Sequence, residues 1–283
     1  MDVLITGAST GIGRAVALRL DREGWRVFAG VRKPEDGEAL KAAATSGRLV
    51  PLIIDVTDAD TITRAREEVD EAIGSTRGLN GLVNNAGIGV GGPVEFVELD
   101  EWRRQLEVNV IGQVAVTQAF LPQLRAGKGR IVNIGSVGGL LANPFLAPYC
   151  SSKFAMEAIT DSLRVELRKW GMWVAIIEPG SIATPIWEKA DSHYAEALAA
   201  LPPEGRELYG RDVEAFAKAF LKVGTRAMPA EAVADTVLHA LTAKKPKPRY
   251  VIGREAKVRL ALSRILPARA MDAITSRVVG IGR

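Results

Sequence analysis

A tyrosine and a lysine stand four positions apart in the segment Pro-Tyr-Cys-Ser-Ser-Lys-Phe-Ala, residues 148–155. Apolar residues continue this segment with helical spacing, so Tyr149 and Lys153 should share one face of a helix, one turn apart. A free tyrosine has a pKa of about 10, and a neighbouring ammonium group lowers that pKa. The pair could therefore move a proton on or off a substrate oxygen. A tyrosine and a lysine four positions apart are, however, more often an exposed aromatic residue beside a solvated charge than a catalytic pair.

A glycine-rich turn, Thr-Gly-Ala-Ser-Thr-Gly-Ile-Gly, occupies residues 6–13. It follows an apolar run typical of a buried strand and precedes a helical pattern. Glycines let the backbone approach a pyrophosphate, and the unpaired N–H groups at the start of the next helix attract anions. Glycine clusters are common in turns, but this position in a first βαβ unit indicates a dinucleotide site.

The end of the second expected strand bears on the choice of cofactor. An acidic residue there holds the ribose hydroxyls of NAD, whereas a basic residue accommodates the additional phosphate of NADP. The chain reads Val-Arg-Lys-Pro at 31–34, and its first acid is Glu35. Arg32 can bind a phosphate through two hydrogen bonds, and Lys33 adds a second positive charge. NADP(H) is therefore favoured, and NAD(H) stays the alternative because basic residues at strand ends are often merely solvated.

Short apolar strands alternate with helical patterns along the first 180 residues. Strands rich in Val, Ile and Leu that are interleaved with helices indicate a parallel sheet covered on both faces. We therefore expect an α/β fold with one doubly wound parallel sheet, a Rossmann fold, and a site at the carboxyl ends of its strands. The expected strands span 3–6, 26–31, 48–54, 79–84, 130–134 and 173–177, and the expected helices 12–22, 58–73, 99–125 and 149–170.

The pattern loosens after residue 185. Residues 185–225 look helical but irregular, with Pro202-Pro203 and Gly205-Arg206 as interruptions, and are expected to form either a substrate lid or a structural or subunit-contact segment. A helix at 230–241 and a last strand at 250–253 follow. The predicted organisation is a single dinucleotide-binding and catalytic domain over 1–253 and a basic amphipathic tail over 254–283.

The composition excludes several classes of protein. A single cysteine, Cys150, rules out an intrachain disulfide and a multi-cysteine zinc site, and two histidines leave little for a histidine-based metal centre. Metal-free chemistry is therefore expected. The first strand begins almost at residue 2 without a signal-peptide pattern, and no apolar run approaches the roughly 20 residues that span a bilayer, so a cytoplasmic location is expected.

Taken together, these motifs resemble the short-chain dehydrogenase/reductase family. The glycine turn has the family's spacing, Asp55-Val56 resembles its adenine-contacting pair, and Asn84-Asn85-Ala86-Gly87 matches its motif after the fourth strand. Asn109 stands at the family's helix asparagine, and Ser136 lies thirteen residues before Tyr149. Pro179-Gly180, with Thr184 close behind, matches the loop that contacts the nicotinamide carboxamide. The motifs keep the family's order from residue 2 to about 185.

The resemblance implies a role for each residue. Tyr149 is the acid or base, and Lys153 supports its charge and binds the nicotinamide ribose. Ser136 holds the substrate oxygen, and Asn109 anchors a water in a proton relay toward Lys153. Taken alone, each of these residues could also have a purely structural role. The implied catalytic residues are Asn109, Ser136, Tyr149 and Lys153, and the implied cofactor-binding residues are Gly7, Ser9, Thr10, Gly11, Ile12, Gly13, Arg32, Lys33, Asp55, Val56, Asn85, Ala86, Gly87, Tyr149, Lys153, Pro179, Gly180, Ile182 and Thr184.

Two positions depart from the family's patterns or invite another reading. Thr10 stands where some NADP-using relatives carry a basic residue, so the choice of cofactor rests on Arg32 and Lys33. Cys150 is next to Tyr149, but a cysteine that packs the helix is a commoner explanation than a reactive thiol.

The resemblance extends to the branch of retinol and hydroxysteroid dehydrogenases. The residues that carry it are Val31-Arg-Lys-Pro, Phe96-Val-Glu-Leu and Ile177-Glu-Pro-Gly-Ser. We expect a bulky apolar alcohol or carbonyl substrate of steroid or retinoid type. The alternatives are a broad-specificity carbonyl reductase using NAD(H), a non-catalytic nucleotide-binding regulator, and a lyase or epimerase. Side chains that could line an apolar pocket, or else form core, are Ile186, Trp187, Tyr194, Leu198 and Leu201.

The C-terminal tail is basic, with 11 Lys/Arg against 2 Asp/Glu from residue 244 to 283. Val258, Leu262, Ile265 and Leu266 form one helical stripe opposite Arg254, Lys257 and Arg264. Packing of this stripe on the domain or on a second subunit is preferred, and peripheral membrane contact is the alternative. Nucleic-acid binding is not expected, because no aromatic residues are interleaved with the basic ones. The family's usual dimers and tetramers imply a homo-oligomer formed through the helices that bear Asn109 and Tyr149.

Overall fold

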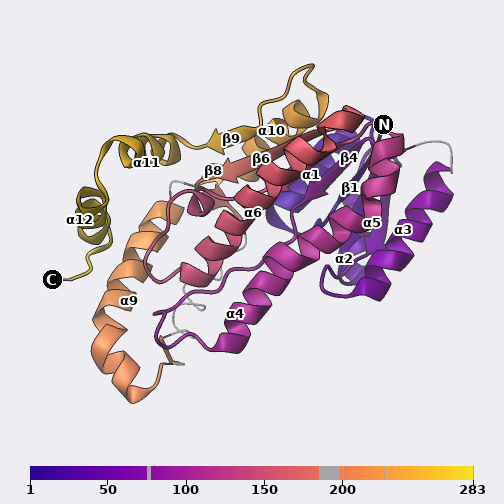
Figure 1. Ribbon diagram of the computed structural model, residues 1–283. Coiled ribbons are helices and arrows are strands. Elements are labelled where there is room, and N and C mark those ends of the chain that lie inside the picture. Colours follow the sequence, from indigo (N-terminus) through magenta and orange to yellow (C-terminus); the bar gives the residue numbers. More distant parts are fainter. Residues whose placement is uncertain (75–77, 185–197, 200, 226, 283) are drawn as a thin grey trace.

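The computed structural model describes residues 1–74, 78–184, 198–199, 201–225 and 227–282, which build a layered α/β fold (Figure 1). Its central sheet has seven strands in the order β3-β2-β1-β4-β5-β6-β9, and every neighbouring pair is parallel. The order reverses direction between β1 and β4, which creates the crevice where doubly wound folds bind ligands. The strands are β1 (Asp2–Ile5), β2 (Arg26–Val31), β3 (Leu49–Ile53), β4 (Gly81–Asn84), β5 (Arg130–Ile134), β6 (Trp173–Pro179) and β9 (Arg249–Ile252).

Helices cover both faces of the sheet because alternate strand residues point to opposite sides. In β1, Val3 and Ile5 pack with α1 (Gly11–Arg22), α2 (Pro34–Ala43) and α10 (Ala230–Thr242). Leu4 of the same strand packs in a second core with α3 (Ala59–Ile73) and α5 (Gly112–Ala126). α6 (Ala147–Glu166) lies on this second side (Figure 1). The doubly wound parallel sheet predicted from the sequence is confirmed.

Two local predictions in the first half were incomplete. α2 was not predicted, because its sequence buries only Gly37 and Leu40 and so lacks a clear apolar period. The helix expected over 99–125 is interrupted: α4 (Leu99–Leu106) leads into a π-helical segment, Glu107–Ile111, before α5 begins. Insertions of this kind are frequent at functional sites, and this one contains Asn109.

The C-terminal third also differs from its prediction. α9 (Pro203–Gly224) is one unbroken helix, so Gly205-Arg206 does not interrupt it. Pro202 and Pro203 mark its beginning, where a proline ring fits and no backbone N–H is needed. On either side of residues 185–225, β7 (Ile182–Ala183) and β8 (Met228–Pro229) form a separate two-stranded parallel sheet.

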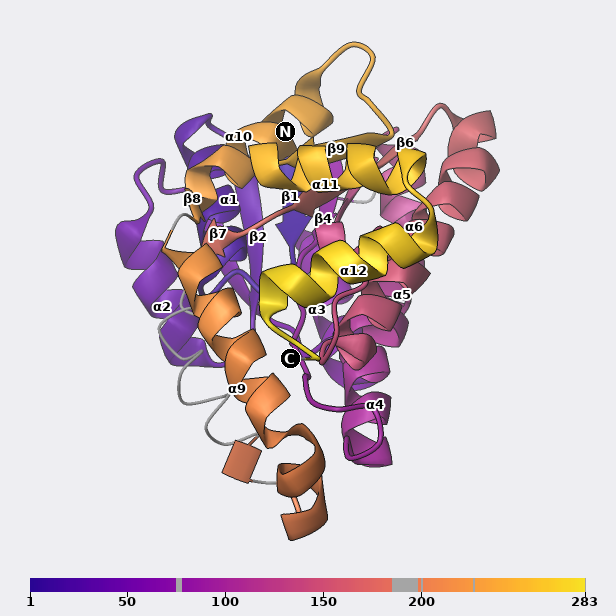
Figure 2. The same cartoon turned by 90° about the vertical axis from the view of Figure 1, so that its left-hand side faces the viewer.

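The chain ends in two helices, α11 (Arg254–Ile265) and α12 (Ala268–Val279). Together with α9 they lie beyond the carboxyl ends of β6 and β9 (Figures 1 and 2). The sequence favoured packing of the α11 stripe on the domain or on a second subunit. Packing on the domain was wrong, because Val258, Leu262 and Ile265 are 52%, 37% and 79% exposed. Packing on a second subunit stays a prediction. The helix packs through its opposite side, where Ala256 is buried. In the described part of the chain, no helix has the length and apolar character needed to cross a bilayer.

Candidate active site

The glycine turn follows β1 directly. Gly7 and Gly11 have φ angles of +65° and +54°, which favour glycine. A Cβ on Gly13 would lie 2.1 Å from the Gly7 carbonyl oxygen, so this position also requires glycine. α1 begins at Gly11, the Thr10 side chain makes no capping hydrogen bond, and no acid lies in the first turn. The turn therefore presents helix N–H groups that suit a phosphate.

Asn85 holds the glycine turn in place. Its side-chain amide donates hydrogen bonds of 2.9 Å to the carbonyls of both Thr6 and Gly7. In return, the buried Thr6 hydroxyl accepts from the N–H groups of Asn85 at 3.0 Å and Ala86 at 3.1 Å. The loop after β4 and the loop after β1 are thus locked together, and Gly87 follows with an exposed backbone. The motif Asn84-Asn85-Ala86-Gly87, which the sequence analysis expected to contact the cofactor, therefore also stabilises the glycine turn.

The candidate adenosine end of the site lies after β2 and β3. Arg32 and Lys33 are exposed, and Lys33 immediately precedes α2 without a capping hydrogen bond from its side chain. Burial by itself would raise the pKa of Asp55, but hydrogen bonds from Thr57 and the charge of Arg32 together lower it. Val56 is buried against α5, because a Cβ on Gly112 would lie 2.7 Å from its side chain. Arg32 and Asp55 therefore face one another across neighbouring strand ends.

Ser136 and Tyr149 come together at the end of β5. Ser136 caps a short turn, Val137–Gly139, by accepting a hydrogen bond of 3.0 Å from the Gly138 N–H. Tyr149 stands in the first turn of α6. Burial raises the pKa of the Tyr149 phenol, and a hydrogen bond with the Ser136 side chain opposes that rise. A Cβ on Gly138 would lie 3.2 Å from the tyrosine ring, so this residue also leaves room for it.

Lys153 is buried one turn further along α6. Its Nζ donates a hydrogen bond of 2.9 Å to the Ile134 carbonyl and lies 6.0 Å from the centre of the Tyr149 ring. Burial lowers the pKa of Lys153 to about 8. The sequence predicted that this ammonium group would lower the pKa of Tyr149. In the structure, desolvation of the phenol has the larger effect, and the lysine is bonded to a backbone carbonyl instead.

The π-helical segment aims Asn109 at the loop after β4. Asn109 is buried, accepts from the Ile88 N–H at 2.8 Å and donates to the Ile88 carbonyl at 3.0 Å. It also donates to Ser152 Oγ at 3.1 Å, and that hydroxyl donates to the Tyr149 carbonyl at 2.7 Å. Asn109 is therefore linked to the helix that carries Tyr149 and Lys153.

The sequence reasoning missed Gln105, which lies one turn before Asn109. Gln105 is fully buried and accepts from the Val90 N–H at 2.7 Å. It donates to the Ile88 carbonyl at 3.0 Å, so two amide side chains grip the same loop. The signal available in the sequence was a pair of amide residues four positions apart on a helix facing this loop. Ser152, equally buried, was also missed.

The loop expected to contact the nicotinamide begins at the end of β6. The Gly180 N–H donates to the Ile252 carbonyl at 2.9 Å, which ties the loop to β9. Ile182 is buried in β7 opposite Met228, and Thr184 is half-buried. Of the proposed pocket residues, Leu201 is buried and Leu198 half-buried. Ile186, Trp187 and Tyr194 lie outside the described residues.

An aromatic cluster joins α9 to the loops beside Tyr149. Phe145 stacks edge-on against Tyr209 and Phe216 of α9, with ring centres 6.5 and 5.7 Å apart. Phe96 meets Tyr209 at 5.8 Å, and the Tyr209 hydroxyl donates to Glu95 at 2.8 Å. Phe145 has a φ of +59°, a conformation that is strained for a residue with a bulky side chain. These rings pack α9 against the loop that leads into the helix of Tyr149.

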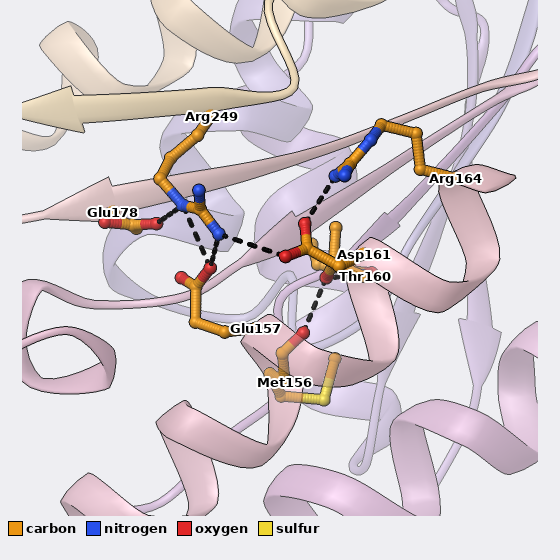
Figure 3. A network of polar contacts seen from close by, with 8 residues as sticks. Met156, Glu157, Thr160, Asp161, Arg164, Glu178 and Arg249 are labelled. Carbon is orange, nitrogen blue, oxygen red and sulfur yellow. Dashed lines mark hydrogen bonds and ion pairs between the residues drawn. The ribbon is translucent and has the colours of Figure 1, made fainter.

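A charged network lies beneath the loop after β6 (Figure 3). The Arg249 Nε donates to Glu178 at 2.8 Å and to Glu157 at 3.0 Å, and its Nη2 lies 3.7 Å from Asp161. Burial, followed by a hydrogen bond with Glu157, raises the pKa of Glu178 to about 9. A hydrogen bond between two carboxyl groups requires one of them to keep its proton. The network connects α6 with β6 and β9, immediately before Pro179-Gly180.

Comparisons with known proteins identify the family of the chain. The family model described as short chain dehydrogenase matches residues 2–195. The chain is 39% identical to retinol dehydrogenase 5 of Mus musculus, over 98% of this chain and 88% of the mouse protein. It is 38% identical to NADPH-dependent 3-dehydrocapnine reductase of Ornithobacterium rhinotracheale, over 96% and 94% of the two chains. A 17-beta-hydroxysteroid dehydrogenase type 6 of Bos taurus is 37% identical over 97% and 87%.

Solved structures show the same fold. A short-chain dehydrogenase from Streptomyces avermitilis matches with a TM-score of 0.76 and 27% identity, covering 98% of this chain and 96% of that one. A short chain dehydrogenase from Burkholderia cenocepacia in complex with NADP matches with a TM-score of 0.71 and 25% identity, with the same coverage. The family and branch expected from the motifs are confirmed. The chain belongs to the short-chain dehydrogenase family of oxidoreductases, in the branch that contains retinol and hydroxysteroid dehydrogenases.

Proposed function

We propose that this chain interconverts an alcohol and a ketone or aldehyde with NADP(H), and that Tyr149 moves the proton on the substrate oxygen. The observation that carries the proposal is the convergence of Ser136, Tyr149 and Lys153 at the carboxyl end of β5. Ser136 is hydrogen-bonded to Tyr149, and Lys153 is buried one turn away. Asn109 is linked to the same helix through Ser152.

The residues suit a reduced or oxidised nicotinamide dinucleotide. The glycine turn leaves no space for side chains at Gly7 and Gly13, and the start of α1 offers N–H groups to a pyrophosphate. When bound, the cofactor supplies or accepts the hydride. In the reductive direction, Tyr149 donates its proton to the carbonyl oxygen while Ser136 donates a hydrogen bond to the same oxygen. Lys153 Nζ stays bonded to the Ile134 carbonyl, and its charge, 6.0 Å from the centre of the Tyr149 ring, is proposed to favour the resulting phenolate at that distance.

NADP(H) is the proposed cofactor rather than NAD(H). Arg32 and Lys33 are exposed at the end of β2, where the additional phosphate of NADP would lie, and Arg32 is already paired electrostatically with Asp55. One relative is named as NADPH-dependent, and one similar solved structure contains NADP. These two descriptions concern the related proteins, and they support NADP(H) as the cofactor of this chain.

The proposed substrate is a bulky apolar alcohol or carbonyl compound. The cluster of Phe96, Phe145, Tyr209 and Phe216 joins α9 to the loop before the helix of Tyr149, and we take it as one side of the substrate pocket. Relatives named for retinol and for a 17-beta-hydroxysteroid act on such compounds. Residues 185–225 are proposed as the lid, and α9 makes up most of its described part.

A homodimer or homotetramer is proposed through the helices that bear Asn109 and Tyr149. Four apolar side chains are exposed on these elements, which is the surface expected of an interface that is uncovered in a single chain. Light scattering should show an oligomer that Phe154→Asp dissociates; an unchanged mass would place the contact elsewhere. The exposed residues are Leu106, Ile111, Phe154 and Val165.

The outer stripe of α11 is proposed to contact an anionic membrane surface. Arg254, Lys257 and Arg264 are exposed around the stripe, so two such faces would repel each other in a dimer. Vesicles containing phosphatidylglycerol should sediment the protein, and Leu262→Asp should abolish this while Leu208→Asp, an equivalent change on α9, should not. If the unaltered protein does not bind the vesicles and Leu262→Asp dissociates an oligomer, the stripe instead contacts a second subunit. The cytoplasmic location expected from the sequence stays a prediction.

The deciding experiment for the reaction is absorbance at the reduced-nicotinamide band. NADPH and NADH would be tested with a panel of apolar ketones and aldehydes. Tyr149→Phe should abolish NADPH consumption, whereas Tyr250→Phe, the same change on the edge strand β9, should leave it intact. Turnover that survives Tyr149→Phe would refute the proposed role of the phenol.

A further inference from the structure

The inner side of α11 lies against two loops of the candidate active site. Its buried residue Ala256 approaches the loop after β6, because a Cβ on Gly180 would lie 3.4 Å from the Ala256 Cβ. One turn later, Arg259 reaches the segment 140–146, which connects the Ser136 turn with the helix that carries Tyr149. The helix at the start of the basic tail therefore borders the site as well as the surface.

Arg259 is held in an unusual way for a half-buried guanidinium. Its Nη2 donates a hydrogen bond of 3.0 Å to the side-chain oxygen of Asn143. Among the residues that the structure describes, no carboxylate lies within ion-pair distance of it. Burial lowers the pKa of Arg259, with the nearby Cys150 thiol as a smaller opposing influence. A buried charge without a counter-ion is costly, so the arrangement needs a compensating contact. Here that contact is the amide of Asn143.

Asn143 also makes hydrogen bonds at the start of α6, the helix that carries Tyr149. Its carbonyl accepts from the Leu146 N–H at 3.3 Å, just before α6 begins. Its backbone is also hydrogen-bonded to the Cys150 thiol, the residue next to Tyr149. Two residues further along the loop, the Phe145 carbonyl accepts from the Gly92 N–H at 2.8 Å. The loop is thus pinned on one side by the segment after β4 and on the other by α11.

We propose that Arg259 is a positioning residue, which fixes the loop 140–146 and thereby the placement of Ser136 relative to Tyr149. The consequence for turnover rests on the proposed function. The fixing of the loop does not, because it is a property of the folded chain. The tail predicted as a separate segment from residue 254 then contributes to the catalytic unit.

Cys150 provides a direct probe, since it is the chain's single cysteine and is buried beside the loop. The rate at which a maleimide labels Cys150, followed by intact mass, reports how often the loop opens. Arg259→Ala and Asn143→Ala should each raise this rate on the order of tenfold, the effect of losing a hydrogen bond made by a charged group. The double variant should label no faster than either single one. Arg259→Lys should fall between Arg259→Ala and the unaltered chain.

Arg264→Ala is the matched control, because it removes an exposed arginine from the outer side of the same helix. It should leave labelling unchanged. In turnover assays, Arg259→Ala should lower kcat for carbonyl reduction by a similar factor and leave KM for NADPH unchanged, with a circular dichroism melt showing a folded chain. Arg259→Lys should restore part of kcat.

Two results would overturn the proposal. One is a labelling rate in Arg259→Ala equal to that of the unaltered chain, whatever happens to activity. The other is additive acceleration in the double variant with Asn143→Ala, which would show that the two residues act independently. If the unaltered chain reduces no carbonyl compound at all, the proposed function fails, and the labelling rates still decide the role of Arg259.

Discussion

Replacing Glu178 by glutamine should change how the stability of the protein depends on pH. Burial and the neighbouring Glu157 raise the pKa of Glu178 from 4.5 to about 9, against the influence of Arg249. In the native state at pH 7 the Glu178 carboxyl therefore keeps its proton, whereas in the unfolded chain it is ionised. A group of this kind stabilises the native state fully below about pH 4.5, and its contribution is lost as the pH rises toward about 9.

The magnitude follows from one proton held by the native state alone. Each pH unit inside this window changes the free energy of unfolding by about 1.36 kcal/mol, so the change between pH 6 and pH 8 is about 3 kcal/mol. Glutamine is neutral at every pH and lacks this dependence. The stability of Glu178→Gln relative to the unaltered protein should therefore increase by about 3 kcal/mol over these two pH units.

Urea unfolding at pH 6, 7 and 8, followed by circular dichroism, measures this difference. Glu255→Gln is the control, because it removes an exposed carboxylate on α11 and should show no such trend. If the curves of Glu178→Gln and the unaltered protein run parallel from pH 6 to pH 8, Glu178 is ionised in the native state. The reasoning about the buried carboxyl pair would then be wrong.

Three further predictions concern the cofactor, the proton and the site's framework. Arg32→Asp should lower kcat/KM for NADPH by about tenfold or more without a matching fall for NADH, because a phosphate-binding charge is lost; equal losses in steady-state assays would argue against a phosphate contact. Carbonyl reduction should weaken as pH rises through about 8, where buried Lys153 loses its charge, and a pH–rate profile that is flat to pH 9 would contradict this. Gln105→Leu should lower the free energy of unfolding, measured in urea, by about 1–3 kcal/mol, because the Val90 N–H loses its acceptor and the Ile88 carbonyl loses a donor.

Much of the fold and the centre of the site could be predicted because their signals are local. Apolar strands, glycine spacing and the Tyr149–Lys153 pair each lie within a few residues. A parallel sheet then gathers the strand ends at one edge, so residues as far apart as Thr6 and Asn85 must meet.

What the sequence did not reveal depends on contacts between distant segments. The hydrogen bond from Arg259 to Asn143 joins residues 116 positions apart, and no pattern in either segment predicts it. Gln105 is buried because it is hydrogen-bonded to Val90 and Ile88, in a loop that is distant in the sequence, and the amphipathic period around it gave no such sign. The stripe on α11 was correctly recognised as apolar. Its exposure, however, depends on which side of the helix the rest of the chain covers.

The short pairing of β7 with β8 has a consequence for how this enzyme can diversify. Ile182 lies opposite Met228, and Ala183 lies opposite Pro229, so the long excursion of the chain between them begins and ends at neighbouring positions. The entropy of closing such a loop grows only slowly with its length. The excursion can therefore be lengthened, shortened or exchanged with little effect on the sheet. Members of the family can in this way keep the sheet and the loops at its carboxyl edge unchanged while the segment that we propose as the lid varies independently.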